Sequence, residues 1–93
     1  MKKPILIAEI SANYCGDIDK AIKLIKCAKD NGANLVKTQT YTADSMTLKS
    51  NKNYFKIKQG LWYSYNLWDL YNKAHTPLIW HKKLFQYAKK IGF

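Results

Sequence analysis

The sequence predicts an α/β fold that forms the first part of a larger parallel-sheet protein. Residues 4–10 are an apolar run rich in branched side chains without polar alternation, which is typical of a strand buried on both faces. A helical pattern follows, and a second strand-like run lies at 34–40. A helix-containing connection joins strands that run in the same direction, so we expect a βαβ unit with parallel strands.

The first helix has clear boundaries in the sequence. Gly16 interrupts the chain and Asp17 is a good N-cap, with the negative charge of Asp19 in the first turn. Gly32 stands where helices commonly end in a left-handed conformation. Between these limits, apolar residues recur at helical spacing, namely Ile18, Ala21, Ile22, Ile25 and Ala28.

The second half of the sequence predicts a long polar loop, here called the excursion, followed by two helices. Residues 41–60 have no clear period, and loops of this length in compact domains are usually functional. Helices are expected at 66–75 and 76–93, the latter with Thr76 as N-cap, Pro77 at its first position and Gly92 as its stop. Its predicted apolar stripe consists of Trp80, Leu84, Phe85 and Ala88. The chain stops where a third strand would begin, so we expect two βα units truncated before strand 3.

Composition excludes several function classes. The formal charge is +10, yet every basic residue is lysine and the lysines are scattered, which favours a solvated surface over a nucleic-acid site. Cys15 and Cys27 have no metal-site spacing and are expected to be reduced thiols. No apolar run is long enough to span a membrane, and Glu9 interrupts the N-terminal run, which argues against a signal peptide. We therefore expect a cytoplasmic protein without membrane or nucleic-acid partners.

The polar residues of the two strands predict a site at the carboxyl ends of the strands. Glu9 is the only glutamate of the chain, and strand alternation puts it on one face together with Ile5, Ile7 and Ser11. Lys37 and Gln39 share a face of the second strand, and Asn13 could join from the following loop. Active sites of parallel α/β folds lie at this end of the sheet. A structural ion pair between Glu9 and Lys37 explains the same pattern and stays an alternative.

Other chemistry-bearing residues favour structural roles. His75 and His81 lie in helical segments without matching acids or cysteines, which indicates packing rather than metal binding. Trp62, Trp68 and Trp80 have spacings that favour core or lid positions over base stacking. Cys15 has no nearby histidine and is interpreted as an ordinary loop thiol.

Several motifs together resemble the N-terminal part of the sialic acid synthase family. The resemblance covers essentially all 93 residues and is carried by AEISAN at 8–13, the GD…A…A..NGA helix at 16–33, LVKTQTYTADSMTL at 35–48, IKQGLW at 57–62, LWDLYNKAHTP at 67–77 and WHKKLFQYAKKIG at 80–92. AEISAN and VKTQTYT resemble the core shared by these synthases. The GLW…LWDLY…A.TP…WH segment is similar to the pseudaminic acid synthase branch rather than to the N-acetylneuraminate synthase branch.

The resemblance implies a (β/α)₈ TIM barrel, of which residues 1–93 are the N-terminal fragment, followed in the family by a C-terminal antifreeze-like domain that is absent here. It implies condensation of phosphoenolpyruvate with an open-chain N-acetylated amino sugar, 2,4-diacetamido-2,4,6-trideoxy-L-altrose, by a cytoplasmic homodimer in cell-surface glycan biosynthesis. A divalent metal, Mn²⁺ or Mg²⁺, assists, with its ligands in later strands and none in this chain. Glu9 corresponds to the catalytic glutamate, and Lys37 and Gln39 to the residues that hold phosphoenolpyruvate, with Asn13 and Thr40 as weaker substrate-binding positions.

The sequence departs from the family pattern at three places. Tyr14 and Cys15 stand in a motif that usually carries a histidine, Ile79 replaces a glutamate, and Tyr63 stands where an acid is common. We expect the 93-residue chain alone to be inactive. The alternatives are an N-acetylneuraminate synthase fragment that acts on N-acetylmannosamine, another phosphate-binding barrel enzyme, and an inactive truncated product or small basic binding module without enzymatic activity.

Overall fold

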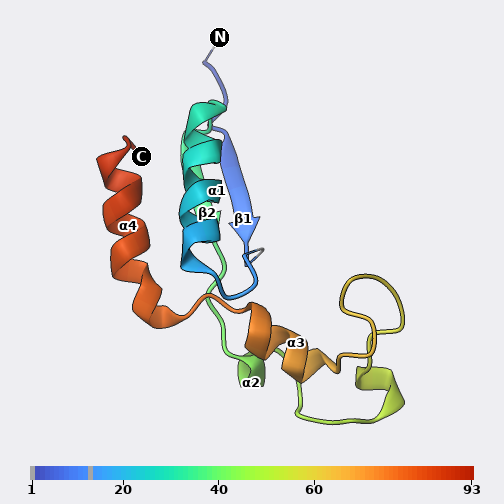
Figure 1. Ribbon diagram of the computed structural model, residues 1–93. Helices are drawn as coiled ribbons and strands as arrows, with labels where there is room; N and C mark the ends of the chain where they lie inside the picture. The colour runs from blue at the N-terminus through green and yellow to red at the C-terminus, as the bar shows by residue number, and fades with distance from the viewer. Residues whose placement is uncertain (1, 13) are drawn as a thin grey trace.

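The computed structural model describes residues 2–12 and 14–93, and within them two parallel strands and four α-helices (Figure 1). The elements follow one another as β1 (Ile7–Ser11), α1 (Ile18–Asp30), β2 (Leu35–Thr38), α2 (Ala43–Met46), α3 (Leu67–Ala74) and α4 (His81–Lys90), with short 3₁₀ turns at Asn53–Phe55 and Leu78–Trp80. The mixed α/β class and the parallel βαβ unit are confirmed. No helix in the described part of the chain is long and apolar enough to cross a membrane.

The two strands pair in a register that ends with an irregularity. Glu9 lies opposite Lys37, but the next pair joins Ser11 to Thr38, so β1 contains one extra residue. Ser11 has a left-handed backbone with φ of 52°, which non-glycine residues rarely adopt. Such bulges bend a strand and change the direction of its side chains, and they are frequent beside active sites. Both strands are shorter than the predicted runs 4–10 and 34–40.

The predicted limits of α1 and α3 are close to the observed ones. The Asp17 carboxylate accepts a hydrogen bond from the Asp19 amide at 2.9 Å, which is the expected N-cap. Gly32 follows α1 with φ of 90°, the left-handed stop predicted for it. Helix α3 lies within the expected range 66–75, and its true N-cap is Asn66, whose side chain accepts from the Asp69 amide at 2.7 Å.

The predicted start of the last helix is wrong. Thr76 does not cap it: the Thr76 side chain is fully buried and its hydroxyl donates to the carbonyl of Gln39 at 2.7 Å. Pro77 precedes a 3₁₀ turn, and α4 begins only at His81. A tertiary hydrogen bond to the end of β2 thus takes the hydroxyl that would have capped the helix. The predicted stop at Gly92 is confirmed by its φ of 104°.

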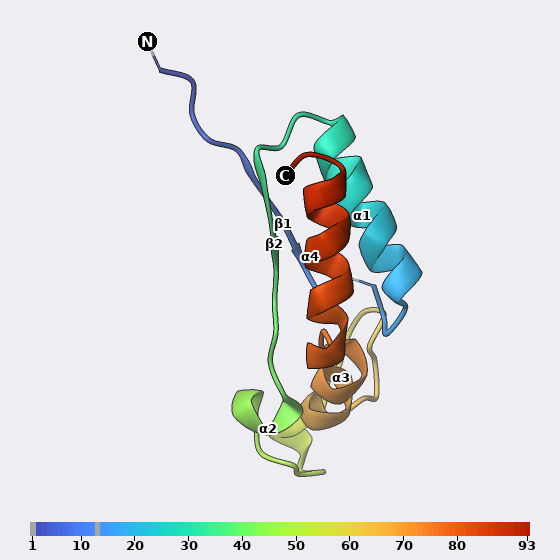
Figure 2. The same ribbon diagram turned by 90° about the vertical axis from the view of Figure 1, so that its left-hand side faces the viewer.

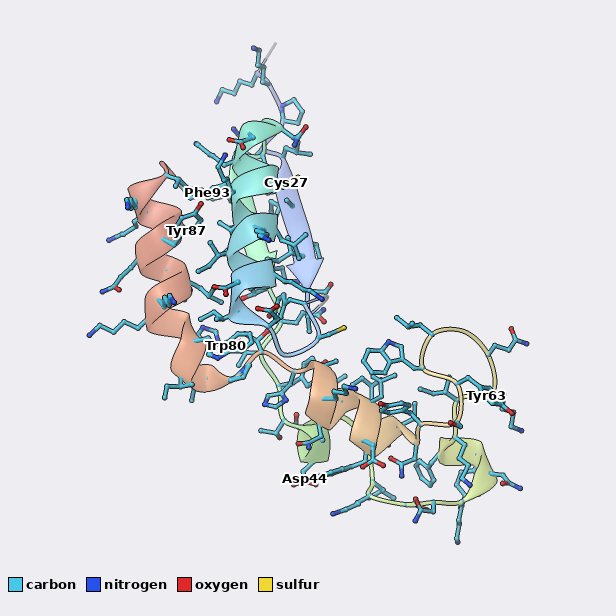
Figure 3. All side chains as sticks on the ribbon, in the orientation of Figure 1. Cys27, Asp44, Tyr63, Trp80, Tyr87 and Phe93 are labelled. Carbon is cyan, nitrogen blue, oxygen red and sulfur yellow. The ribbon has the colours of Figure 1, made fainter. Side chains whose placement is uncertain are left out.

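Helices α1 and α4 cover one face of the sheet (Figures 1 and 2). The buried core between these layers consists of Ile10, Tyr14, Ala21, Ile25, Leu84 and Ala88. Trp80, Tyr87 and Phe93 extend from the α4 region and pack against this core (Figure 3). Two members of the predicted stripe of α4, Leu84 and Ala88, are therefore core residues, whereas Phe85 is 66% exposed, contrary to prediction.

The other face of the sheet is bare, which corrects the prediction of strands buried on both faces. Ile5, Ile7 and Leu35 are all exposed, since none of the described elements covers the side of the sheet opposite α1 and α4. An apolar run indicates that both faces are suited to burial, but it does not show that both are covered within this chain.

The excursion 41–60 contains two short elements that the sequence did not predict. Helix α2 begins with a capping box in which the Thr42 hydroxyl accepts from the Ser45 amide at 3.3 Å. The excursion and α3 form a separate lobe beyond the carboxyl ends of the strands (Figure 1). The radius of gyration is 15.7 Å, against about 12 Å for a compact chain of this length, so the molecule is extended.

Candidate functional site

Glu9 and Lys37 form an ion pair on the bare face of the sheet. The Lys37 ammonium nitrogen lies 3.1 Å from a Glu9 carboxylate oxygen, and the two side chains are 63% and 37% exposed, respectively. The two residues lie opposite each other in the parallel register. The backbone pairing of the strands therefore brings the two charged groups together, and no special side-chain conformation is needed. Strand alternation predicted this shared face, and the ion pair that the sequence left open as a structural alternative is present.

The bulge at Ser11 shapes the surroundings of the Glu9 carboxylate. The Ser11 amide turns back and donates to the other Glu9 oxygen at 2.7 Å. Desolvation raises the pKa of Glu9, but the hydrogen bonds from Lys37 and from the Ser11 amide, with the charge of Lys37, lower it by more in total. The pKa of Glu9 therefore lies below its ordinary value of 4.5, and Glu9 is an ionised hydrogen-bond acceptor at neutral pH.

Gln39 lies beyond the end of β2, in a cavity separate from the ion pair. This cavity has a volume of about 290 Å³ and lies between the strand ends and the α3 lobe. Its lining comprises Ser11, Ala12, Cys15, Gln39, Tyr41, Leu61, Trp62, Leu70 and Ala74. The backbone N–H of Gln39 donates to the backbone carbonyl of Ser11 at 3.0 Å, which ties the ends of the two strands together. The predicted trio is thus divided: Glu9 and Lys37 touch, and Gln39 lines the adjoining cavity.

The two weaker candidates have different outcomes. Thr40 lies on the other side of β2, where its hydroxyl forms a hydrogen bond of 2.5 Å with Nε2 of His81. It lines a groove between β2 and α4 and not the cavity that contains Gln39. Asn13 lies outside the described residues.

Tyr14 and Thr76 form a buried clamp under the strand ends that the sequence did not reveal. Both side chains are fully buried and their hydroxyls are hydrogen-bonded to each other, while the Thr76 hydroxyl also contacts the Gln39 carbonyl. The Tyr14 ring packs against Trp80 with centroids 5.8 Å apart. Burial raises the pKa of Tyr14 to about 12, so its phenol stays neutral near pH 7. The only signal in the sequence was strand alternation, which assigns residues 10, 12 and 14 to one side, although the bulge at Ser11 interrupts that alternation.

The remaining candidates have the packing contacts that the sequence favoured. His75 Nδ1 forms a hydrogen bond of 2.6 Å with the Asn72 carbonyl, and the His81 ring packs against Phe85. Trp68 donates to Asp44 at 2.7 Å and anchors α3 to α2. Cys15 and Cys27 are exposed free thiols. Within residues 2–12 and 14–93, no group of three histidine, cysteine or acidic side chains is placed to hold a metal ion.

Comparison with known proteins gives a consistent result. Residues 24–93 match the model of the NeuB family. The chain is 50% identical over 91 residues to the pseudaminic acid synthase of Campylobacter jejuni strain NCTC 11168, and 44% identical over 91 residues to that of Helicobacter pylori strain 26695. It is also 36% identical over 93 residues to an N,N'-diacetyllegionaminic acid synthase of C. jejuni.

The aligned segments cover nearly all of this chain but little of each relative. In the three alignments they comprise 98%, 98% and 99% of the chain, and 26%, 27% and 28% of the C. jejuni, H. pylori and legionaminic acid relatives. The chain thus spans about a quarter of the length of the curated relatives it matches.

Proposed function

The chain belongs to the NeuB family, and we propose that it forms the first two βα units of a (β/α)₈ barrel of the pseudaminic acid synthase type. In a full-length protein, the remaining units would close the barrel and a small antifreeze-like domain would follow. We infer a cytoplasmic, homodimeric enzyme of nonulosonic acid biosynthesis, with residues 1–93 alone inactive because the barrel is incomplete.

The proposed reaction joins phosphoenolpyruvate to the aldehyde of an open-chain diacetamido trideoxy sugar. C3 of the enolpyruvate attacks the aldehyde carbon, water adds at C2, and the bond from C2 to the phosphate oxygen breaks to release inorganic phosphate. In our proposal, the Lys37 ammonium and the Gln39 amide hold the phosphate or carboxylate of phosphoenolpyruvate. The Glu9 carboxylate accepts a hydrogen bond from the sugar beside the reacting centre.

The observation that carries the proposal is the ion pair of Glu9 and Lys37 at the carboxyl ends of parallel strands. Exposed pairs contribute little to stability, so the fold itself gains little from this one. Both charges lie on an open face next to the cavity that Gln39 lines. An arriving anion can therefore take Lys37 as a partner while Glu9 keeps the hydrogen bond from Ser11.

Tyr14 is not assigned a proton-transfer role in this proposal. It stands where the family usually carries a histidine, but it is fully buried and its pKa is raised to about 12. A phenol with this pKa does not exchange protons near neutral pH as an imidazole does. We propose that Tyr14 holds the strand ends in place through Thr76 and Gln39.

A divalent metal belongs to the family expectation, but the described residues do not fit one. They contain no group of three histidine, cysteine or acidic side chains placed to hold a metal ion. In a full-length protein, the ligands would come from other parts of the barrel.

The choice of sugar rests on the similarity to the named relatives. Identity is 50% and 44% to the two pseudaminic acid synthases, and 36% to the legionaminic acid synthase. We therefore propose the pseudaminic acid precursor as substrate, ahead of the legionaminic acid precursor and of N-acetylmannosamine.

A chimeric enzyme tests the proposal. Residues 1–93 replace the aligned segment of the C. jejuni pseudaminic acid synthase, and phosphate release is measured with phosphoenolpyruvate, the sugar and Mn²⁺. We expect activity with the diacetamido sugar and at least tenfold less with N-acetylmannosamine. Lys37→Ala should raise KM for phosphoenolpyruvate at least tenfold, and Glu9→Gln should lower kcat at least 100-fold.

The matched control is Lys26→Ala, which removes the lysine of the exposed Lys26–Asp30 pair on α1 and should leave both constants unchanged. A soluble chimera without activity would contradict the proposed function. An unchanged KM in Lys37→Ala would remove Lys37 from the phosphoenolpyruvate site.

A further inference from the structure

The cavity that Gln39 lines contains two kinds of lining residues. Ser11 and Gln39 supply polar groups at the ends of the two strands. Its volume of about 290 Å³ is close to the lower end of the roughly 300 to 1,000 Å³ that is typical of small-molecule sites. The apolar and aromatic lining comes from the connection between β2 and α3 and from α3 itself, and consists of Tyr41, Leu61, Trp62, Leu70 and Ala74.

A loop at 57–65, closed by its own backbone, supplies Trp62. The Ile57 amide donates to the Tyr65 carbonyl at 2.9 Å, and the Ser64 amide donates to the Ile57 carbonyl at 3.0 Å. The loop lies beside α3, in yellow in Figure 1. These hydrogen bonds fix the base of the loop, so the position of Trp62 does not depend on a ligand.

The Trp62 indole is also held by contacts of its ring. It packs edge to face on Tyr65, with ring centroids 5.3 Å apart. The ammonium of Lys73 on α3 lies 5.9 Å from the Trp62 ring centroid and donates to the Tyr65 hydroxyl at 3.1 Å. Such a cation is attracted by the electron-rich face of the ring. A wall that is held in place before binding loses little conformational entropy when a ligand packs on it.

The charge of the lining distinguishes between the two substrates of the proposed reaction. The described residues that line the cavity include no lysine, histidine, aspartate or glutamate. A phosphate or carboxylate inside it would lack a charged partner, which is costly. An acetamido group is neutral, so its amide can bond to polar groups at the strand ends while its methyl packs on the apolar lining.

We propose that this cavity receives an acetamido group of the sugar, and that Trp62 is the residue that selects for it by packing against the methyl. Ser11 lines the cavity and donates to the Glu9 carboxylate at 2.7 Å, so the sugar extends from the cavity toward Glu9. Lys37 is then left to phosphoenolpyruvate. This inference rests on the proposed function, because it assigns one part of that site to one part of one substrate.

The chimeric enzyme tests the selection with two neighbouring aromatic residues. Trp62→Ala should raise KM for the diacetamido sugar about tenfold and change KM for phosphoenolpyruvate less than about twofold. Tyr63→Ala is the matched control, because Tyr63 belongs to the same loop but does not line the cavity, and it should leave both constants unchanged. Circular dichroism establishes that both variants fold.

A sugar analogue without the methyl groups separates recognition of the acetamido group from a general change of the loop. In the diformamido analogue, a hydrogen replaces each acetamido methyl. Trp62→Ala should raise KM for this analogue less than about threefold, because the contact that the variant removes is already missing. An equal rise for both sugars would overturn the proposal, as would an unchanged KM for the diacetamido sugar or an equal effect of Tyr63→Ala.

A binding measurement decides the matter if the chimeric enzyme has no turnover. The 93-residue chain has three tryptophans and is labelled with 5-fluorotryptophan, and the Trp62 fluorine signal is identified by its loss in Trp62→Phe. Millimolar diacetamido sugar should shift the Trp62 signal and not that of Trp68, and phosphoenolpyruvate should shift neither.

The two measurements distinguish failure of this inference from failure of the proposed function. A Trp62 shift with an inactive chimera would support the acetamido site and contradict the proposed reaction. With an inactive chimera, no shift, or an equal shift with phosphoenolpyruvate, would overturn the inference. An active chimera whose KM for the sugar is unchanged in Trp62→Ala would overturn the inference and leave the proposed function standing.

Discussion

The two faces of the small sheet carry different kinds of side chains and have different neighbours. On the face toward α1 and α4, Ile10 is 8% exposed and Val36 is half-buried against the core. On the opposite face, Ile7 is 53% exposed and Glu9 and Lys37 form their ion pair in the open. The alternation of side chains along each strand thus puts residues that stabilise the fold on one face and residues that can contact other molecules on the opposite face.

This difference indicates that the side chains that stabilise the fold are distinct from the side chains that are candidates for chemistry. The covered face should be sensitive to loss of volume, since its side chains fill a close-packed interior. The open face should tolerate substitution in the isolated chain, because its side chains lose little contact when they are shortened.

The largest effect is expected from truncating Ile10. Ile10→Ala removes buried methyl groups and should lower the free energy of unfolding by about 2 to 5 kcal/mol. Ile7→Ala, three residues away on the open face, should cost less than about 1 kcal/mol. Urea titration followed by circular dichroism measures both. A cost at Ile7 equal to that at Ile10 would show that the two faces are not distinct.

Alkaline pH should reduce stability through Tyr14. Burial raises the pKa of Tyr14 to about 12 in the folded chain, above its ordinary value of 10.0. The stabilisation of the neutral phenol is therefore complete below pH 10 and is lost as the pH rises toward 12, amounting to about 1.4 kcal/mol at pH 11. Urea unfolding at pH 8 and pH 11 should show this loss, and Tyr14→Phe should lack this part of it. An identical loss in Tyr14→Phe would assign the effect to other groups.

At neutral pH, removing the Tyr14 hydroxyl should have a smaller effect. Tyr14→Phe keeps the ring against Trp80 but breaks the hydrogen bond to Thr76, which should cost about 1 kcal/mol. Thr76 still donates to Gln39, so the clamp is weakened rather than lost. The exposed Tyr54 supplies the control, because Tyr54→Phe removes a hydroxyl at the surface and should leave thermal unfolding unchanged.

The sequence predicted the features that depend on local chemistry. Asp17 caps α1, Gly32 and Gly92 end helices in left-handed conformations, and strand alternation predicts the shared face on which Glu9 and Lys37 lie. Each of these features follows from a single residue type or from the period of a strand. None of them needs information about distant parts of the chain.

The features that the sequence did not predict depend on tertiary contacts. Thr76 has the local signature of an N-cap, but its hydroxyl binds the end of β2. Phe85 fits the apolar period of the last helix, yet only the other stripe members, Trp80, Leu84 and Ala88, pack into or against the core. The bulge at Ser11 and the end of β2 at Thr38, which leaves Gln39 beyond the strand, have no signal in the residue types at those positions.

The smallest effect on the fold is expected at the ion pair itself. Glu9→Gln keeps the side-chain length and an oxygen for the Ser11 amide, and it removes only a partly exposed charge. Because the pKa of Glu9 is lowered in the folded chain, its contribution is present above pH 4.5 and is lost as the pH falls through the lowered pKa. This contribution is present at pH 7 but is small because the pair is partly exposed, so Glu9→Gln should change thermal unfolding at pH 7 very little, with Asp30→Asn as the matched loss of the other ion pair. If Glu9→Gln unfolds the chain, the pair is structural and the open face holds the fold together after all. If the chain is unchanged while the chimeric enzyme loses turnover, this charge serves the reaction and not the fold.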